Sequence, residues 1–366
     1  MNITVIGAGQ GGLATAGHLT LKGHKVTLWN RSLEKLQALK KIGSITMGGV
    51  INGTVQLSAI TSNLEEAIKG ADIISIMITA DGYESIAIKM APYLEDGQKV
   101  LLNSAGLGGA LLFQATLRGT GYCPKITVAE ADNCIYVCRS PEISKSLIKS
   151  IKKIICFSVL PLDQAQGFLD VIHNLYPQFQ LVDDPLVNGI RHVNAAVHTA
   201  GVILNAERIK RKENFNFYTE GITPAIGSYI EMLEKERIAV AEKLGISTQT
   251  TRQWLHSVYN LPMDELYKML QNHNAYSEDI LAPKTFQHRF ILEEVPAKMV
   301  PQLDIARILD IPQPLTTKIA NKACELTGID LFASGRTVEK LGLTEEDICR
   351  YAEQGIAPCL ERISVQ

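Results

Sequence analysis

The sequence has no surplus of basic charge. Its 366 residues include 36 lysines and arginines against 38 aspartates and glutamates, a formal net charge of −2. Proteins that bind nucleic acid or anionic membranes neutralise phosphate groups with an excess of lysine and arginine. The charge balance therefore argues against a nucleic-acid partner and against a membrane partner.

Long apolar runs are also absent. The longest stretch without a charged residue, Val100–Leu117, contains several polar side chains and glycines, so it predicts a buried strand and a turn rather than a membrane span. The first residues enter a strand pattern at once, with no basic segment and no small-residue cleavage site. We therefore expect a cytoplasmic protein.

The seven cysteines form no recognisable framework. Their number is odd, no pair has the C-x-x-C spacing, and none has a regular histidine partner. Disulfide scaffolds have even numbers of cysteines, and zinc sites have short fixed spacings between their ligands. Reduced thiols are expected, and no metal site is predicted.

The sequence does have the length and apolar content of a two-domain globular protein. It is 46% hydrophobic, and domains usually contain about 100–200 residues. Up to about residue 185, short apolar runs alternate with helical patterns, which is typical of parallel βαβ units. The expected strands are Asn2–Ile6, Lys25–Trp29, Asp72–Ile78, Lys99–Asn103, Lys125–Ala129 and Ile154–Val159.

This alternation stops near Pro185, and the later patterns are mostly helical. Pro224–Leu244, for example, has Thr223 as a candidate N-cap, a proline at the first helical position and Gly245 just past its end. The predicted fold class is therefore α/β. A Rossmann-type, mostly parallel sheet in residues 1–185 is followed by an all-helical substrate and catalytic domain in residues 186–366.

A glycine-rich turn follows the first expected strand. Gly7-Ala8-Gly9-Gln10-Gly11-Gly12 fits the G-x-G-x-x-G pattern and opens a helix rich in alanine and leucine. Gly7 permits the tight turn, Gly9 lets the backbone approach a pyrophosphate, and Gly12 lets helix and strand pack closely. The motif predicts a dinucleotide site that includes Gln10, whereas the alternative is a glycine-rich turn in another α/β fold.

The residues after the second strand indicate which dinucleotide is bound. NAD sites usually place an acidic side chain there for the ribose 2′-hydroxyl, but this chain has Asn30-Arg31-Ser32. Arg31 can pair with a 2′-phosphate and Ser32 can donate a hydroxyl group to it. We therefore favour NADP(H) over NAD(H). Stacking of Arg31 on the adenine of an NAD enzyme remains the alternative.

Two further loops leave the expected carboxyl ends of strands, where ligands collect in open α/β sheets. One contains Ala80, and the other begins with Asn103. Small residues there would let a nicotinamide ribose lie against the backbone, and Asn103 could hydrogen-bond to it. Ordinary turns between strands and helices have the same composition, so both interpretations stay open.

An otherwise aliphatic helical segment carries Asn194, His198, Gly201 and Asn205 at i, i+4, i+7 and i+11, on one face. A buried histidine or asparagine is costly unless something hydrogen-bonds to it, and that partner can be a substrate. Histidine also exchanges protons near neutral pH. The alternative interpretation is a core histidine satisfied by the protein itself.

A second polar cluster places Arg289 five residues before Glu294 in an apolar background. An arginine can hold a substrate carboxylate through two hydrogen bonds, and a carboxylate can hold His198 in one tautomer. A surface ion pair between the two residues is the simpler alternative.

Several runs of residues, taken in order, resemble the octopine/nopaline (opine) dehydrogenase family over nearly the whole chain. They are Gly7–Gly12, Leu102-Asn103 with Gly108–Leu111, Cys138-Arg139, Val193–Ala195 with His198, Leu204–Ala206, Tyr218 with Glu220–Pro224, Glu236–Ala239, Arg289 with Val300-Pro301, and Gly335–Thr337 with Glu339–Leu343. The resemblance implies an N-terminal Rossmann domain that binds a nicotinamide dinucleotide and a helical domain that completes a cleft. It also implies reductive condensation of an amino acid with a 2-oxo acid such as pyruvate.

The resemblance assigns roles to particular residues. His198 falls on the family's catalytic histidine, and Arg289 on its substrate arginine. Glu294 takes the position of the aspartate that usually pairs with the histidine, which is a departure of one methylene group. Further candidate substrate-binding residues are Asn194, Asn205 and Arg139. A homodimer is expected.

Two other functions stay open at this stage. The first is an amine-independent keto-acid reductase of the ketopantoate reductase or glycerol-phosphate dehydrogenase type. Those families usually rely on a helical lysine where this chain has His198. The second is a nucleotide sensor without turnover, which the departure at Glu294 leaves open.

Overall fold

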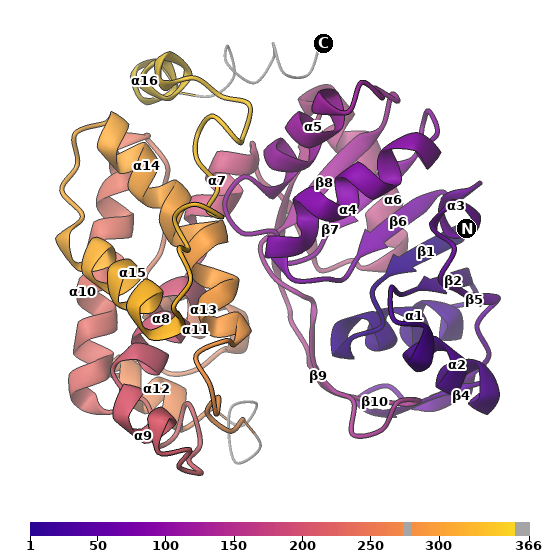
Figure 1. Ribbon diagram of the computed structural model, residues 1–366, viewed down its shortest axis with the longest axis horizontal. Helices are drawn as coiled ribbons and strands as arrows, with labels where there is room; N and C mark the ends of the chain where they lie inside the picture. Colours follow the sequence, from indigo (N-terminus) through magenta and orange to yellow (C-terminus); the bar gives the residue numbers. More distant parts are fainter. Residues whose placement is uncertain (274–279, 356–366) are drawn as a thin grey trace. The chain divides into compact units, whose positions relative to one another are not determined.

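The computed structural model describes residues 1–273 and 280–355, and the chain divides into two compact units. The first unit contains Met1–Ala105 and Gly109–Pro185. The second contains Gly106–Gly108 and the chain from Leu186 onward. Strands with helices make up the first unit, drawn in indigo to magenta, whereas the second is helical (Figure 1). The predicted fold class is confirmed.

The first unit is built on an eight-stranded sheet with the order β12-β11-β8-β7-β6-β1-β2-β5. Neighbouring strands are parallel except for β8 and β11. The strands are β1 (Asn2–Ile6), β2 (Lys25–Trp29), β5 (Ala59–Thr61), β6 (Ile73–Ile76), β7 (Lys99–Leu102), β8 (Thr127–Ala131), β11 (Ile155–Leu160) and β12 (Phe179–Leu181). All six expected strands are present, with shifts of one or two residues at some ends.

A second sheet of four strands, ordered β4-β3-β10-β9, was not expected from the sequence. Its strands are β3 (Ile45–Gly49), β4 (Gly53–Val55), β9 (Tyr136–Arg139) and β10 (Lys145–Ile151). β3 and β4 are short and contain glycine, which weakens the periodic signal of a strand. The parallel pairing of β3 with β10 also joins segments about a hundred residues apart, which local patterns do not reveal.

The helices of the first unit pack against these sheets and complete its core. They are α1 (Gln10–Leu21), α2 (Leu33–Ile42), α3 (Leu64–Ile68), α4 (Tyr83–Met90), α5 (Gly109–Gly119) and α6 (Ala165–Leu175), with short 3-10 turns η1 (Ala80–Gly82), η2 (Ala91–Tyr93) and η3 (Leu162–Gln164). In the parallel pairs, Ile3 lies beside Val26 on one side and Ile73 on the other. All three are buried, as expected for a parallel sheet covered on both faces.

The described part of the second unit consists mainly of helices. They are α7 (Pro185–Ile190), α8 (Asn194–Ile203), α9 (Ala206–Lys210), α10 (Pro224–Lys243), α11 (Thr251–Tyr259), α12 (Leu266–Gln271), α13 (Arg289–Leu292), a π-helical turn η4 (Val295–Met299), α14 (Val300–Ile308), α15 (Pro314–Thr327) and α16 (Glu345–Gln354). The predicted start of α10 is confirmed, because the Thr223 side chain accepts a hydrogen bond from Ile226 N. Gly245 follows its end with φ +71°.

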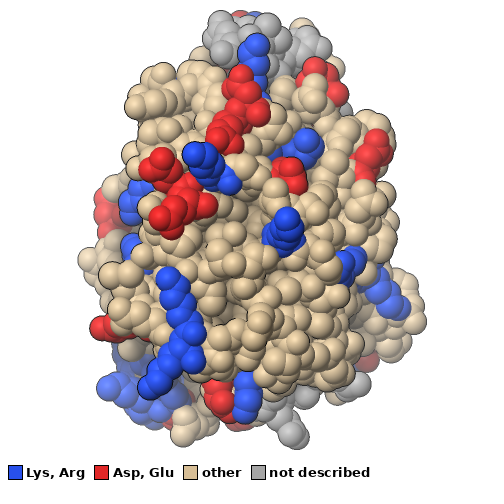
Figure 2. All heavy atoms as spheres, turned by 90° about the vertical axis from the view of Figure 1, so that its right-hand side faces the viewer, with Lys and Arg blue, Asp and Glu red and all other residues tan. Residues whose placement is uncertain are grey.

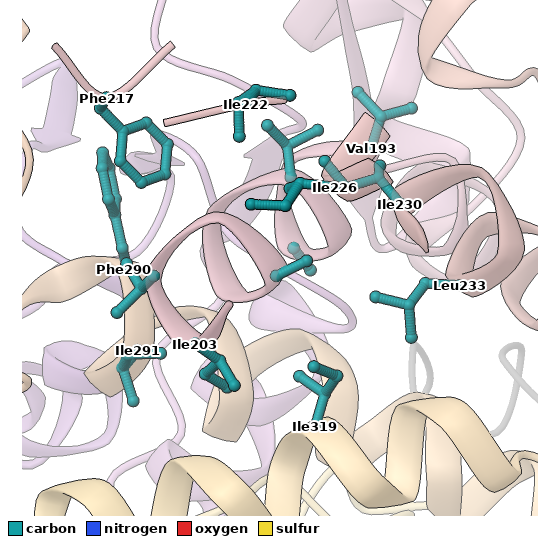
Figure 3. Packing of buried hydrophobic residues seen from close by; sticks show 14 of the residues in the cluster. Val193, Ile203, Phe217, Ile222, Ile226, Ile230, Leu233, Phe290, Ile291 and Ile319 are labelled. Carbon is teal, nitrogen blue, oxygen red and sulfur yellow. The ribbon is translucent and has the colours of Figure 1, made fainter. Parts of the chain in front are cut away.

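Helix α8 lies at the centre of this unit and contacts α10, α13 and α15. Figure 3 shows the aliphatic side chains around it, among them Ile226 and Ile230 of α10 and Ile319 of α15, with Phe217 and Phe290 at one end. Burial of such side chains contributes about 1.5–3 kcal/mol each. The core therefore holds α8, and with it His198, in a fixed place.

Two properties of the surface and the helices complete the description. On the face shown in Figure 2, acidic and basic side chains both occur among more numerous uncharged residues, in keeping with the near-neutral net charge. Across residues 1–273 and 280–355, no helix combines the length and hydrophobicity needed to span a bilayer.

Candidate active site

The glycine turn has the geometry expected for it. Gly7 directly follows β1 with φ +109°, a conformation that side chains rarely adopt. A Cβ atom at Gly12 would lie only 1.8 Å from Gly7 O, so α1 can pack this closely on the turn only with glycine there. Among the described residues other than its chain neighbours, none has an atom within 4 Å of the place where a Gly9 Cβ would be. A pyrophosphate therefore has room to approach the backbone at Gly9.

The amino end of α1 is available to an anion. Gly9 is the N-cap residue, no side chain caps the helix, and its first turn contains no acidic residue. Gln10, the first residue of the helix, is exposed. The unpaired N–H groups and the helix dipole at such an end favour phosphate. This turn fits the dinucleotide phosphates that its sequence predicts.

The loop after β2 supports this turn and presents two polar side chains. Asn30 Oδ1 accepts a hydrogen bond from Ala8 N at 3.1 Å, so this side chain holds the glycine turn. Arg31 and Ser32 are exposed. Within the described residues, neither side chain is engaged by another group, and both are available to a ligand.

The other two predicted loops follow β6 and β7 at the same edge of the sheet as Gly7, because these strands are parallel to β1. Ala80 is buried at the start of η1. The buried Asn103 amide donates hydrogen bonds to Ser75 Oγ at 3.0 Å and Ile76 O at 3.2 Å. In this structure Asn103 therefore ties the ends of two strands together.

A buried chain of polar groups passes through His198 on α8. His198 Nδ1 lies 2.6 Å from Glu294 Oε1, and Nε2 lies 3.1 Å from Tyr218 Oη. An ionised carboxylate only accepts hydrogen bonds, so Nδ1 donates to Glu294. This contact selects one tautomer of the neutral imidazole, in which Nε2 carries the lone pair and accepts from the Tyr218 hydroxyl.

Aromatic rings fix the plane of this imidazole. The Phe290 ring stacks on it with 4.1 Å between centroids and an angle of 15°, and Phe217 lies edge-on at 6.3 Å. Phe217 approaches α8 at Gly201, where a Cβ atom would lie 2.5 Å from the ring. Glycine on this face of the helix therefore makes room for the ring that packs beside His198.

The charges around His198 favour its neutral form. Burial lowers the pKa of His198, and although Glu294 raises it, Arg289 and Lys298 lower it further. Burial alone would raise the pKa of Glu294, but Lys298 and then His198 hold it well below the usual range. Glu294 is therefore a carboxylate at neutral pH, and the imidazole can take up a proton.

Arg289 begins α13, and its guanidinium carbon lies 5.8 Å from the centre of the Phe290 ring. Its side chain is exposed and has no carboxylate partner among the residues that the structure describes. The expected surface ion pair with Glu294 is not formed, since the oxygens of Glu294 face His198 and Lys298. Arg289 is free to bind an anion.

The other three predicted substrate-binding residues lie in different parts of the structure. Asn194 is half-buried at the start of α8. Asn205 lies beyond the end of α8 rather than on it, and its amide donates to Gly201 O and Gly221 O, which joins the helix to the loop before α10. Arg139 ends β9 in the first unit and donates to the carbonyl of the preceding residue.

Two residues of the site were missed by reasoning from the sequence. Tyr218 is 20 positions from His198, so no helical spacing connects them. Lys298 lies four residues after Glu294, a spacing that often marks an ion pair on a helix. That spacing could have suggested the ion pair, but it gives no indication that the pair is buried.

Comparisons with known proteins agree with this geometry. Residues 182–327 match the family model described as NAD/NADP octopine/nopaline dehydrogenase, alpha-helical domain. Residues 2–118 match that of the NAD-dependent glycerol-3-phosphate dehydrogenase N-terminus. An opine dehydrogenase of Arthrobacter sp. (strain 1C) is 33% identical over 341 residues, which cover 93% of this chain and 94% of the relative.

Solved structures share the fold over nearly the whole length. An octopine dehydrogenase structure with NADH and L-arginine has a TM-score of 0.77 at 20% identity, covering 98% of this chain and 99% of that one. A yersinopine dehydrogenase structure with NADP+ bound has a TM-score of 0.67 at 16% identity, covering 97% and 98%. With the identity to the Arthrobacter relative over more than nine-tenths of both chains, these matches show that the chain belongs to the opine dehydrogenase family of NAD(P)-dependent oxidoreductases.

Proposed function

We propose that this protein catalyses the NAD(P)H-dependent condensation of an amino acid with a 2-oxo acid such as pyruvate. The amine adds to the ketone carbon, water leaves, and an imine forms. The dinucleotide, when bound at the glycine turn, supplies the hydride for the imine carbon, and the product is an N-(1-carboxyalkyl) amino acid. The observation that carries this proposal is the buried His198 held between Glu294 and Tyr218.

His198 handles the protons of this reaction. An amino acid arrives as an ammonium ion, which has no lone pair for attack, so it must first lose a proton. Nε2 carries the lone pair that takes this proton, while Glu294 stabilises the imidazolium that results. The imidazolium can then return a proton when water leaves. In this proposal the amine takes the place of the Tyr218 hydroxyl at Nε2.

Arg289 is the group in this proposal that holds the carboxylate of the 2-oxo acid. Its guanidinium can form two parallel hydrogen bonds to a carboxylate, which fix orientation as well as position. Asn194 and Arg139 stay predicted substrate ligands. Asn205 contributes by holding the loop before α10 to α8, since its amide already donates to two carbonyl groups.

The reaction is tested by supplying the substrates separately. We expect oxidation of NADPH with pyruvate to require an amino acid from a panel of the common ones, and the product to contain a new secondary amine by mass spectrometry. Oxidation with pyruvate alone at the same rate would instead favour an amine-independent reductase. Binding of NADPH without oxidation for any pair of substrates would favour a nucleotide sensor.

We further propose a preference for NADP(H), in which Arg31 and Ser32 bind the 2′-phosphate. Both side chains are exposed at the end of β2, and the chain has no carboxylate there to repel a phosphate. Hydrogen bonds to charged groups contribute about 1.5–3 kcal/mol, so Arg31→Ala should raise the KM for NADPH by about ten-fold or more. NADH lacks the phosphate and serves as the control within the same variant. An equal rise for both dinucleotides would contradict the preference.

The cytoplasm is the proposed location, because a reducing compartment suits the cysteines. None of the six in the described residues forms a disulfide, and Cys123 and Cys349 are exposed. The homodimer stays a prediction.

A further inference from the structure

A lysine is buried beside the proposed proton-handling pair. Lys298 Nζ lies 2.6 Å from Glu294 Oε2, and the two side chains are only 5% and 3% exposed. Surface ion pairs elsewhere in the described residues, such as Lys268–Glu265 and Lys322–Glu325, have side chains that are 40% or more exposed. Burying an ammonium ion is costly, and a surface ion pair would not need it. The burial of Lys298 therefore indicates a specific role for its positive charge.

The local backbone places Lys298 at this point. It belongs to η4, a π-helical turn, and such turns often occur at functional sites. The carbonyl groups of Pro296 and Ala297 accept hydrogen bonds from Arg336 N and Leu107 N, respectively. The turn is thus held by backbone contacts outside the helix, and Lys298 need not be buried to support it.

Each of the two carboxylate oxygens of Glu294 faces one side chain that can carry a positive charge. Oε1 faces His198 Nδ1 and Oε2 faces Lys298 Nζ. With Lys298 charged, the carboxylate is already neutralised and does not require an imidazolium. Without that charge, the buried carboxylate would draw a proton onto His198, since an unpaired buried charge is unfavourable.

We propose that Lys298 is a positioning residue that neutralises Glu294 and thereby keeps the imidazole of His198 unprotonated and ready to accept a proton. The inference rests on the proposed function, because only the neutral imidazole can deprotonate an incoming ammonium. Lys298 itself touches Glu294 and acts through it.

Other charged or titratable groups also face this cluster and remain in every variant. The positive charge of Arg289 on α13 lowers the pKa of His198. His288, just before that helix, interacts electrostatically with both Arg289 and His198. His192, before α8, interacts electrostatically with Lys298, Glu294 and His198, and also with Arg237 of α10. Tyr218 contacts Nε2. Because these groups are unchanged, a difference after mutation of Lys298 reports the charge at that position.

The test is a titration of the His198 ring by NMR in the full-length protein with labelled histidine. The signal is assigned by its loss in His198→Gln. Lys298→Met is expected to raise the midpoint by about one pH unit or more, because the opposing positive charge is lost. Lys268→Met removes a solvent-accessible lysine of α12 that has the same i,i+4 spacing to Asp264, just before that helix, and should leave the midpoint unchanged.

Activity gives an independent measurement. The acid limb of kcat/KM should move to higher pH by the same amount as the ring titration. At a fixed pH below this limb, kcat/KM should then fall about ten-fold for each pH unit that the limb moves, while Lys298→Arg should retain the original profile. A changed ring titration with an unmoved acid limb would contradict the role of His198 in turnover and leave the electrostatic role of Lys298 standing. An unchanged ring titration in Lys298→Met would overturn the inference.

A second comparison applies if Lys298→Met fails to fold. Lys298→Gln removes the positive charge but keeps a polar side chain that can donate a hydrogen bond to Glu294 Oε2. We expect the His198 midpoint to be higher in Lys298→Gln than in the unchanged protein, because the charge that neutralises Glu294 is lost. Equal midpoints would show that the lysine charge has no influence on the ring and would overturn the inference.

Discussion

Replacement of His198 by glutamine should reduce kcat for reductive condensation by about 10²–10⁴-fold, the usual contribution of a general acid–base group. Glutamine can still form hydrogen bonds with Glu294 and Tyr218, but it cannot take up a proton near neutral pH. The dissociation constant for NADPH should change little, because the glycine turn lies in the other unit. Initial rates with a saturating pair of substrates, together with calorimetric titration of NADPH, measure both quantities.

The matched control is His256→Gln. His256 belongs to the same unit, but its side chain is exposed and lies near the carbonyl of Leu261. We expect this variant to keep full activity. A His198→Gln enzyme with more than a tenth of the original kcat would rule out the proposed role of the imidazole.

Replacement of Glu294 by glutamine should impair folding and turnover together. The buried Lys298 would lose its counter-charge, and breaking a buried ion pair of this kind costs about 3–5 kcal/mol. The imidazole would also lose the carboxylate that orients Nδ1 and stabilises the protonated ring. Glu294→Asp keeps the charge on a side chain one methylene shorter, so it should be less destabilised than Glu294→Gln.

Urea unfolding can be followed separately in the second unit. Of the two tryptophans, Trp29 lies in β2 and Trp254 in α11, so fluorescence in a Trp29→Phe background reports on Trp254. Glu207→Gln, which removes an exposed acidic partner of Lys210, serves as the control and should leave the midpoint unchanged. Equal midpoints for Glu294→Gln and Glu207→Gln would contradict the importance of the buried pair.

Local patterns were sufficient for six of the eight strands of the large sheet and for α10, but they missed the two three-residue edge strands β5 and β12. Parallel strands and their helices leave strong periodic signals, and Thr223 with Pro224 marked a helix start that the structure confirms. The four-stranded sheet was missed because its strands are short and pair across long stretches of sequence. The end of α8 was also missed, since Asn205 continues the periodic pattern but uses its side chain to join the helix to another loop.

The contacts within the site could not be predicted from local sequence patterns alone. His198 and Glu294 are 96 positions apart, so spacing could suggest each residue but not their contact. The chemistry of the residues offered their pairing as one possibility, the family resemblance implied it, and the structure shows that glutamate reaches the imidazole as well. The resemblance said nothing of Lys298, because the need for a buried lysine follows from three-dimensional charge balance. Tyr218 stood within the resemblance, but its hydrogen bond to Nε2 depends on the path of a loop.

The position of segment 106–108 affects how well this protein can be divided into two fragments. It lies between β7 and α5 in the sequence but groups with the helical unit, where Leu107 N donates to Ala297 O and the Arg336 guanidinium donates to Leu107 O. A fragment truncated after Pro185 would retain these three residues without their partners. The complementary fragment would lack two backbone hydrogen-bonding groups. Each half expressed from a single cut after Pro185 should therefore be less stable than the same part of the intact chain.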